Sequence, residues 1–579
     1  MITHSPAKRD GSAPLADPGP RRRRPWVVWR DADEGGSVSG KGKAGLAAGL
    51  AALVVLVGVA LYAIWHTRGT PASAATDFLA AWEKQDHAAM DEAVTEPSEA
   101  MWPAYEQLRE GLGVSAVKTT LGKVAETGDG ATAAFTATLT LSGGAAWTYQ
   151  GSLPLTVHDR HWKVSWRPAA LHPKLAEGQS FALSTKWPER AAILDAEGNR
   201  LNAPGASGSV QMLTGTVDPV TAADLKRLGP AYRKGDVTGH GGIEQAYEQR
   251  LAGTPVIDVR ITDRRGKTVA PVGHIAGKKG QPVRTSLDPA VQRAAAKAIV
   301  GQDKPTALVA VRPATGEVLA AANVPGGFNR AIHGHYPPGS TFKAITGAAL
   351  LSDGLSPSAT VSCPKTATVG GRSFRNFEHQ AYGSVSFREA FARSCNTAFA
   401  LQTKSRLSGE ALTETAGRFG MNAPLNIGIP AEGGSFPKPR DEAELASAAF
   451  GQGRVISNPL HMATVAAAVS DGTWRPPALV REPEVTQRAE ERKLDPKVTE
   501  QLRGLMRAVV TEGSAEGKGL PSGTAGKTGT AEYGGGAEPP THAWFMGFRD
   551  DIAFAVVRED GKAGGAVAAP IGADFLNAL

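Results

Sequence analysis

The sequence has little cysteine and lacks the patterns that bind metal ions. Only Cys363 and Cys395 occur in 579 residues. They could form a disulfide in an oxidising compartment or remain two half-buried thiols, and the sequence alone leaves both open. No cluster of Asp and His has metal-ligand spacing, and a His-Glu-x-x-His motif is absent, so neither a metal nor a cofactor is expected.

Charge of either sign is also modest. The formal net charge is +7, and residues 1–43 alone carry nine Lys/Arg against five Asp/Glu. No basic face with interleaved aromatic residues emerges, so nucleic-acid binding is not expected. Hydrophobic residues at 41% and charged residues at 21% are ordinary for globular protein. The length then indicates three or four domains.

Residues 44–65 form an uncharged apolar run of 22 residues. As a helix it would span about 33 Å, which is enough to cross a bilayer. Basic residues precede it, including Arg21 to Arg24, and little beyond Arg68 follows. The positive-inside rule predicts a single-pass cell-membrane protein with residues 1–43 as a disordered cytoplasmic tail and the rest extracytoplasmic. Cleavage at Ala72-Ser73-Ala74 is the alternative, but the run and its preceding arm are too long for a signal peptide.

Two non-catalytic modules are predicted next. In residues 70–170, helical patterns around Trp82 and Tyr105 are followed by alternating strands, which predicts a small α+β unit. The polar stretch from Asp159 to His161 is interpreted as a hairpin turn. Residues 171–284 combine short strand-like runs with Gly- and Pro-containing turns, and this pattern predicts a second module.

The last segment, residues 285–579, has longer elements. A helix is expected after Asp288, and apolar runs at 307–311 and 318–322 read as strands joined by a turn at 313–317. A sheet flanked by helices is the expected architecture.

Within this segment, Ser340 follows a Pro-Pro-Gly turn, where an apolar helical pattern begins. Lys343 lies one turn later on the same face. A serine hydroxyl is a weak nucleophile until a base removes its proton, and a lysine kept neutral by burial or by neighbouring charge can be that base. Ser-x-x-Lys alone is common by chance, so it needs support from other motifs.

Two further clusters supply that support. Ser394-Cys395-Asn396 lies between two helical patterns, and a short loop there would present a hydroxyl and an amide; a simple helix N-cap with a buried thiol is the alternative. Lys527-Thr528-Gly529-Thr530 reads as a strand, and two more strands follow it. The spacing around Gly526 does not fit a phosphate loop, and a Gly-x-Ser-x-Gly elbow is absent. His333 and His335 are interpreted as turn or surface residues.

The order Ser-x-x-Lys, Ser-x-Asn, Lys-Thr-Gly resembles the signature of penicillin-binding proteins and serine β-lactamases. Other transpeptidase-like segments are Phe450-Gly451-Gln452-Gly453, Asn458-Pro459-Leu460 and Ala543-Trp544-Phe545. Residues 70–170 resemble an NTF2-like domain in layout. The stretch from Arg190 to Gly198 resembles the opening of the pedestal (dimerisation) domain, but departs from it at Ala191 and Ala196. The resemblance is good over residues 285–579 and thinner before them. Because nothing resembling a glycosyltransferase domain precedes residue 285, the chain is most similar to class B penicillin-binding proteins, monofunctional peptidoglycan D,D-transpeptidases.

The resemblance implies an α+β multi-domain fold, with a transpeptidase domain preceded by an anchor, an NTF2-like domain and a pedestal domain. It also implies the role of each motif residue. Ser340 attacks the D-alanyl-D-alanine bond of a stem peptide and Lys343 takes its proton. Ser394 relays a proton to the leaving D-alanine, and Asn396 binds the substrate amide. Lys527, with the strand residues Thr528, Gly529 and Thr530, binds the substrate carboxylate, and the N–H groups of Ser340 and Thr530 hold the oxyanion.

The partners implied are stem peptides, covalently bound β-lactams and a membrane glycosyltransferase of the cell-wall machinery. Two rival functions are a β-lactamase, which shares the motifs but hydrolyses its acyl-enzyme, and a non-catalytic β-lactam sensor or scaffold. The sequence does not give the β-lactam affinity, the acceptor residue, the oligomeric state, or a role in elongation, division or sporulation.

Overall fold

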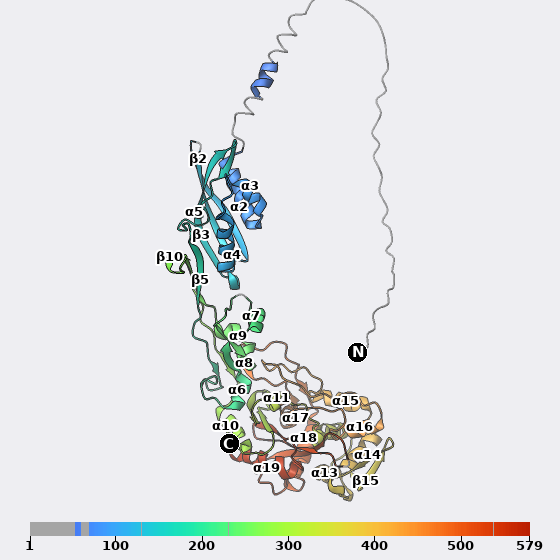
Figure 1. Cartoon of the computed structure of the whole chain (residues 1–579). Coiled ribbons are helices and arrows are strands. Elements are labelled where there is room, and N and C mark those ends of the chain that lie inside the picture. The colour runs from blue at the N-terminus through green and yellow to red at the C-terminus, as the bar shows by residue number, and fades with distance from the viewer. Residues whose placement is uncertain (1–51, 60–68, 129, 230, 537) are drawn as a thin grey trace, which may run out of the picture. The chain divides into compact units, whose positions relative to one another are not determined.

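The computed structural model describes residues 52–59, 69–128, 130–229, 231–536 and 538–579 (Figure 1). The predicted tail at residues 1–43 and most of the predicted anchor at 44–65 lie outside the described residues. Residues 52–59 are helical, and their large apolar side chains, such as Leu53 and Val59, are exposed. Among the described helices, none combines the length and the hydropathy that a bilayer crossing requires.

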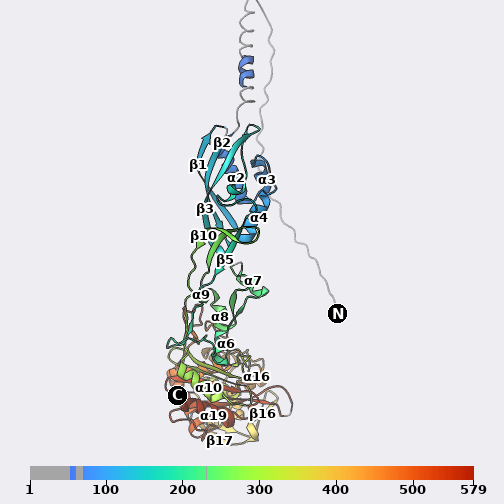
Figure 2. The ribbon, with the colours of Figure 1, turned by 60° about the vertical axis from the view of Figure 1, so that its left-hand side comes forward.

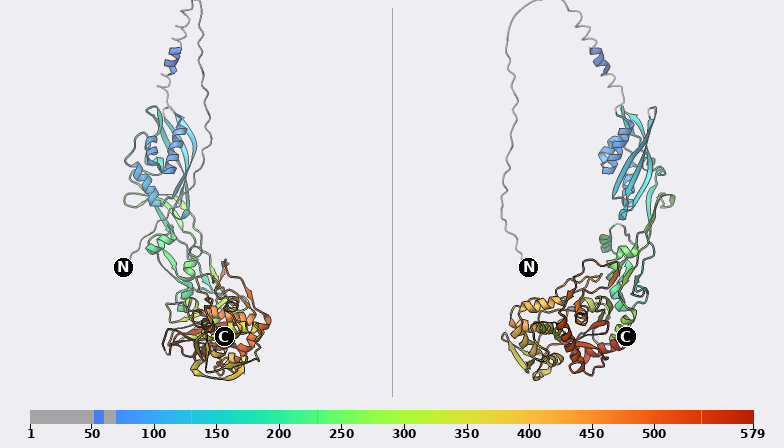
Figure 3. Two further views of the ribbon diagram at one scale, coloured as in Figure 1. Left: turned by 90° about the vertical axis from the view of Figure 1, so that its right-hand side faces the viewer. Right: turned by 180° about the vertical axis from the view of Figure 1, so that it is seen from behind.

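The first module is a sheet with helices on one face (Figure 2). The antiparallel strand order is β1-β2-β3-β4, and Figure 3 shows from two further sides that the blue helices stay on one face of the cyan strands. The alternating pattern of the sequence predicts this, because every second residue of β2 is buried. The elements are α2 (Pro71–Lys84), α3 (His87–Ala93), α4 (Met101–Leu112), β1 (Ala116–Thr127), β2 (Gly130–Thr140), η1 (Ser142–Gly144), β3 (Ala146–His158), β4 (His161–Val164) and α5 (Pro168–Leu171).

The core of this module includes side chains from further along the chain. A second sheet, with order β10-β9-β5, contributes buried residues from β5 (Ser180–Lys186) and β9 (Val256–Thr262), while β10 (Thr268–Ile275) lies at its edge. Phe181, Val259 and Ile261 belong to the same apolar cluster as Trp82 and Phe135. The indole Nε1 of Trp147 also donates to the carbonyl oxygen of Val272 over 3.3 Å. Residues within the predicted second module therefore complete the core of the first.

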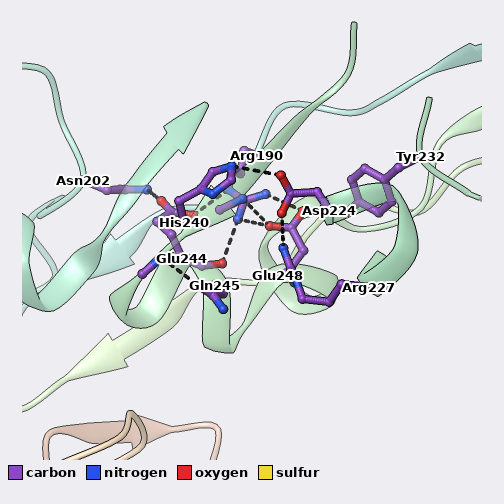
Figure 4. Close-up of polar contacts among 11 residues, drawn as sticks. Arg190, Asn202, Asp224, Arg227, Tyr232, His240, Glu244, Gln245 and Glu248 are labelled. Atoms are coloured by element: carbon purple, nitrogen blue, oxygen red, sulfur yellow. Dashed lines mark hydrogen bonds and ion pairs between the residues drawn. The ribbon is translucent and has the colours of Figure 1, made fainter. Parts of the chain in front are cut away.

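A buried ion cluster organises the rest of the second module (Figure 4). The Arg190 guanidinium donates to Glu244 at 2.6 Å and to Glu248 at 2.7 Å. Glu248 also accepts from the Tyr232 hydroxyl at 2.5 Å, and Asn202 donates to Glu244 at 2.6 Å. The elements are β6 (Ile193–Leu194), α6 (Gly208–Thr214), β7 (Thr216–Pro219), α7 (Ala222–Leu228), β8 (Val237–His240), α8 (Gly242–Ala246), α9 (Glu248–Ala252) and β11 (Val283–Thr285).

The third module is built on a five-stranded sheet of order β13-β12-β23-β22-β21, in which all neighbours are antiparallel. Helices cover both faces, since every residue of β12 is buried. α10 and α19 pack against each other and against the sheet, and they lie side by side in Figures 1 and 2. The elements are α10 (Pro289–Ile299), β12 (Thr306–Val311), β13 (Val318–Val324), β21 (Ala525–Glu532), β22 (Thr541–Arg549), β23 (Ile552–Arg558) and α19 (Gly564–Asn577).

A helical lobe fills the sequence between β13 and β21. Its helices are α11 (Arg330–His333), η2 (Gly339–Phe342), α12 (Lys343–Ser352), η3 (Phe377–His379), α13 (Phe387–Ala392), α14 (Asn396–Arg406), α15 (Gly409–Arg418), α16 (Glu442–Ala448), α17 (Pro459–Asp471) and α18 (Pro496–Thr511). Its short strands are β14 (Thr360–Cys363), β15 (Thr366–Val369), β16 (Arg372–Arg375), β17 (Gly383–Ser386), β18 (Thr473–Trp474), β19 (Val480–Glu482) and β20 (Arg492–Lys493). Sheet and lobe share one apolar core.

Candidate active site

Ser340 lies in η2, a single turn of 3₁₀-helix that leads directly into α12. The sequence predicts it in the first turn of an α-helix, so the observed turn is slightly tighter. Gly339 has φ +55°, and a Cβ there would lie 2.8 Å from the carbonyl oxygen of Thr530. Only glycine fits both the conformation and the space. The Pro-Pro-Gly turn thus holds the serine directly against β21.

Ser394 lies between α13 and α14 with φ +60°, an unusual conformation for serine. The N-cap of α14 is Cys395, whose buried Sγ accepts from the N–H of Ala398. The helix N-cap that the sequence offers as an alternative is therefore present in this cluster, at Cys395, and it leaves the Ser394 hydroxyl and the Asn396 amide for other contacts. Cys395 is also bonded to Cys363 in a disulfide, which settles the pairing that the sequence left open. The bridge joins the Ser394 loop to the end of β14.

The third motif, Lys527 to Thr530, lies on β21, one of the two edge strands of the sheet. It comprises Lys527, Thr528, Gly529 and Thr530. A Cβ at Gly529 would lie 2.9 Å from the methyl group of Thr341. The strand can approach the Ser340 turn closely because no side chain stands at this position.

These elements bring the motif side chains together around one amine. Lys343 Nζ lies 3.1 Å from Ser340 Oγ and 3.3 Å from Ser394 Oγ. Its two shortest contacts are 2.6 Å to Asn396 Oδ1 and 2.7 Å to the carbonyl oxygen of Ser394. Lys527 Nζ donates to the carbonyl oxygen of Thr528 at 3.0 Å.

Both lysines are fully buried, and within the described residues neither forms an ion pair with a carboxylate. Burial, and to a lesser degree the charge of Lys527, lowers the pKa of Lys343 well below its usual range. Burial lowers the pKa of Lys527 to about 7. A buried amine without a counter-ion favours its neutral form, which can accept a proton.

An open cleft of about 810 Å³ lies above these lysines. Ser340, Ser394, Asn396, Thr528 and Thr530 line it. Aromatic and charged side chains also line the cleft, namely Phe374, Arg375, Phe377, Tyr382, Arg393, Phe450, Glu512, Glu516, Lys518 and Glu532. No group of three or more metal-capable side chains occurs in the described part of the chain.

Three family models match the chain, each over a different segment. Residues 306–577 match the penicillin binding protein transpeptidase domain. Residues 70–179 match the NTF2-like N-terminal transpeptidase domain, and residues 205–285 match the penicillin-binding protein dimerisation domain. The Mycolicibacterium smegmatis peptidoglycan D,D-transpeptidase PbpA is 34% identical over 394 residues, which cover 57% of this chain and 78% of PbpA. The chain belongs to the class B penicillin-binding proteins.

Solved structures of this family have the same fold. Pseudomonas aeruginosa PBP2, in complex with WCK 5153, aligns with a TM-score of 0.58 at 27% identity and covers 68% of this chain and 96% of its own. A ceftriaxone acyl-enzyme of penicillin-binding protein A from Mycobacterium tuberculosis aligns with a TM-score of 0.55 at 26% identity, covering 67% and 98%. The multi-domain fold expected from the sequence, apart from the anchor, is confirmed.

The site of this penicillin-binding protein also uses residues that the motifs did not indicate. Asn396 Nδ2 donates to the backbone oxygen of Arg375 at 3.1 Å. Ser514 Oγ lies 2.6 Å from Thr528 Oγ1. Neither Arg375 nor Ser514 belongs to a recognisable sequence motif. Arg375 contributes only its backbone oxygen, and Ser514 lies in the loop that follows α18. The contacts arise from tertiary packing.

Proposed function

We propose that this class B penicillin-binding protein is a peptidoglycan D,D-transpeptidase that cross-links stem peptides through an acyl-enzyme on Ser340. The observation that carries the proposal is the bonding of Lys343. A neutral amine has two protons and one lone pair. The Asn396 amide oxygen and the Ser394 carbonyl oxygen can only accept, so they use both protons. The lone pair is then left for a hydroxyl proton, and Ser340 has the nearer hydroxyl, at 3.1 Å against 3.3 Å for Ser394.

In the proposed acylation, Ser340 Oγ bonds to the carbonyl carbon between the two terminal D-alanines while its proton moves to Lys343 Nζ. The N–H groups of Ser340 and Thr530 hold the resulting oxyanion, and losing one such donor typically costs about 2.7–4 kcal/mol. The C–N bond then breaks. Ser394 gives its proton to the leaving amine and recovers one from Lys343, and D-alanine departs.

In the second half-reaction the acceptor amine of a neighbouring stem peptide attacks the ester carbonyl. Its proton returns through Lys343 to Ser340 Oγ, and an amide cross-link replaces the ester. Asn396 binds the substrate amide, while Lys527, Thr528 and Thr530, with Gly529 between them, bind the terminal carboxylate. A carboxylate beside Lys527 favours the ammonium form, whose pKa burial has lowered to about 7.

The test is intact mass spectrometry of the full-length chain after incubation with benzylpenicillin, with Ser340→Ala as the matched control. We expect a persistent adduct with the mass of the intact drug, absent from the variant. Rapid loss of the adduct with accumulating penicilloate would favour a β-lactamase. If no adduct forms, turnover of a D-Ala-D-Ala thioester separates a low-affinity transpeptidase from a non-catalytic sensor or scaffold.

We also propose that residues 44–65 anchor the protein in the cell membrane, with residues 1–43 in the cytoplasm and residues 70–170, 171–284 and 285–579 outside it as NTF2-like, pedestal and transpeptidase domains. The three family matches begin in these last three segments in order. A single cysteine in place of Ser37 or of Ser522 would decide the topology in intact cells. A membrane-impermeant maleimide should label only the cysteine at position 522.

A membrane glycosyltransferase is the proposed partner, since glycan strands that carry stem peptides must be polymerised before they can be joined. In a reconstituted system with a lipid-linked precursor, cross-linked product should require both enzymes. Cross-linking without the polymerase would remove this partner from the proposal.

A further inference from the structure

The Thr528 hydroxyl has one hydrogen-bond partner in the described part of the chain, the hydroxyl of Ser514. The two oxygens lie 2.6 Å apart, and both residues line the cleft. Thr530, the next hydroxyl along β21, differs, because its Oγ1 accepts from the N–H of Gly564 at 3.2 Å.

The direction of the Ser514–Thr528 bond decides what Thr528 can offer a ligand. Each hydroxyl has one proton. If Thr528 donates to Ser514, its proton is used and the oxygen facing the cleft repels an anion. If Ser514 donates, the Thr528 proton is free to point at a carboxylate. A negative charge in the cleft therefore favours the second arrangement, in which Ser514 donates to Thr528 and Thr528 donates to the anion. Hydrogen bonds linked in this way strengthen one another.

Ser514 is held for this task by backbone contacts to two other elements. Its N–H donates to the carbonyl oxygen of Ala392, the last residue of α13, at 3.0 Å. A Cβ at Gly513 would lie 2.4 Å from that same oxygen, and a Cβ at Gly565 would lie 2.3 Å from the carbonyl oxygen of Ser514. The segment is thus packed without space between α13 and α19. Because α13 ends two residues before Ser394, Ser514 contacts both β21, through Thr528, and the helix that leads to Ser394.

We propose that Ser514 is a positioning residue for the substrate carboxylate: it donates to Thr528 and so directs the Thr528 proton to the carboxylate of the donor peptide or of a β-lactam. The inference rests on the proposed function, since it assigns this end of the cleft to the carboxylate.

The test compares two acylating drugs that differ in this group alone, benzylpenicillin and its methyl ester, on the full-length chain. Ser514→Ala should lower the second-order acylation rate for benzylpenicillin by about tenfold, as expected for one hydrogen bond to a charged group. The rate for the ester should change by less than about twofold. Ser514→Thr keeps the hydroxyl and should restore the rate for benzylpenicillin. Ser522→Ala, an exposed serine in the same connection, is the matched control.

A double-mutant cycle separates this role from a structural one. In the Thr528→Val background the donor chain no longer reaches the ligand, so Ser514→Ala should have no further effect on benzylpenicillin. An equal loss with both drugs, an unchanged rate with benzylpenicillin, or a full additional loss in the Thr528→Val background would each overturn the inference. These outcomes are distinct from failure of the proposed function, in which the wild-type chain would form no adduct at Ser340.

Discussion

Lys343 and Lys527 are buried close to one another, and neither forms an ion pair with a described carboxylate. Burial of a charge costs free energy, so both amines have lowered pKa values. In the proposed acylation, the neutral form of Lys343 is the one that accepts the proton of Ser340. The burial that makes the charged form of this amine unfavourable is therefore also what prepares the proposed base.

This arrangement predicts a pH dependence of acylation. The rate should fall as the pH drops through the pKa of Lys343, because protonation removes the base. Lys527→Gln deletes the like charge that contributes to the lowered pKa of Lys343, so that pKa should rise and the acid limb of the rate profile should move to higher pH. The maximal rate should also fall by about 10²-fold through loss of carboxylate binding. The measurement is the second-order rate of benzylpenicillin acylation against pH.

Lys518→Gln is the control for this experiment, because Lys518 lines the same cleft but is exposed, so its charge is screened by water and salt. The acid limb of the pH–rate profile of Lys518→Gln should coincide with that of the wild type. An unmoved acid limb in Lys527→Gln would show that burial alone sets the pKa of Lys343.

At the level of elements, the disulfide between Cys363 and Cys395 ties β14 to the loop before α14. Cys395 is the middle residue of the second motif, so the bridge holds the positions of Ser394 and Asn396. The Asn376 side chain, buried beside it, donates to the carbonyl oxygen of Pro364 and accepts from the N–H of Thr397. Covalent and polar contacts thus fix the same loop.

Breaking the bridge should therefore affect both stability and rate. The two cysteines are 32 residues apart, and closing a loop of this size contributes about 3–4 kcal/mol in the chain-entropy account. Cys363→Ser/Cys395→Ser should lower the free energy of unfolding by about that amount and slow acylation at Ser340. Denaturant unfolding and acylation kinetics measure the two effects. A reductant should reproduce both in the wild type and change neither in the variant; wild-type kinetics in the variant would show that Asn376 suffices to hold the loop.

The sequence predicts the helices, strands and motifs of the transpeptidase module well, but it predicts the contacts between them poorly. The strands at 307–311 and 318–322, the helix after Asp288 and the three motifs all follow from short local patterns. The disulfide, the backbone oxygen of Arg375 and the hydroxyl of Ser514 do not. Each is a contact between segments far apart in the chain, and no local pattern encodes which segments will meet. The Arg190 cluster is similar, since its carboxylates lie 54 and 58 residues away.

At the scale of the whole molecule, the core of the first module depends on strands beyond it in the sequence. Val259 is fully buried among residues of that module. We predict that Val259→Asp lowers the free energy of unfolding of the first module by about 4 kcal/mol or more, because the substitution buries an unpaired charge. Thermal unfolding of the full-length chain should show an early transition, while acylation at Ser340 persists.

The matched control is Val269→Asp, a valine on the neighbouring strand β10 that is half exposed. This change should alter stability by less than about 0.5 kcal/mol. If both variants unfold alike, the shared core is not what stabilises the first module.

Because β5 leaves the first module, β9 returns to it and β10 leaves it again, the chain passes between the two N-terminal modules three times. A single polypeptide connection acts as a swivel, since rotation about a few backbone bonds costs little. Three connections side by side resist torsion, because turning one module would have to twist three strands that are hydrogen-bonded to one another in the order β10-β9-β5. The link at this point is therefore better suited to transmit a rotation than to absorb it.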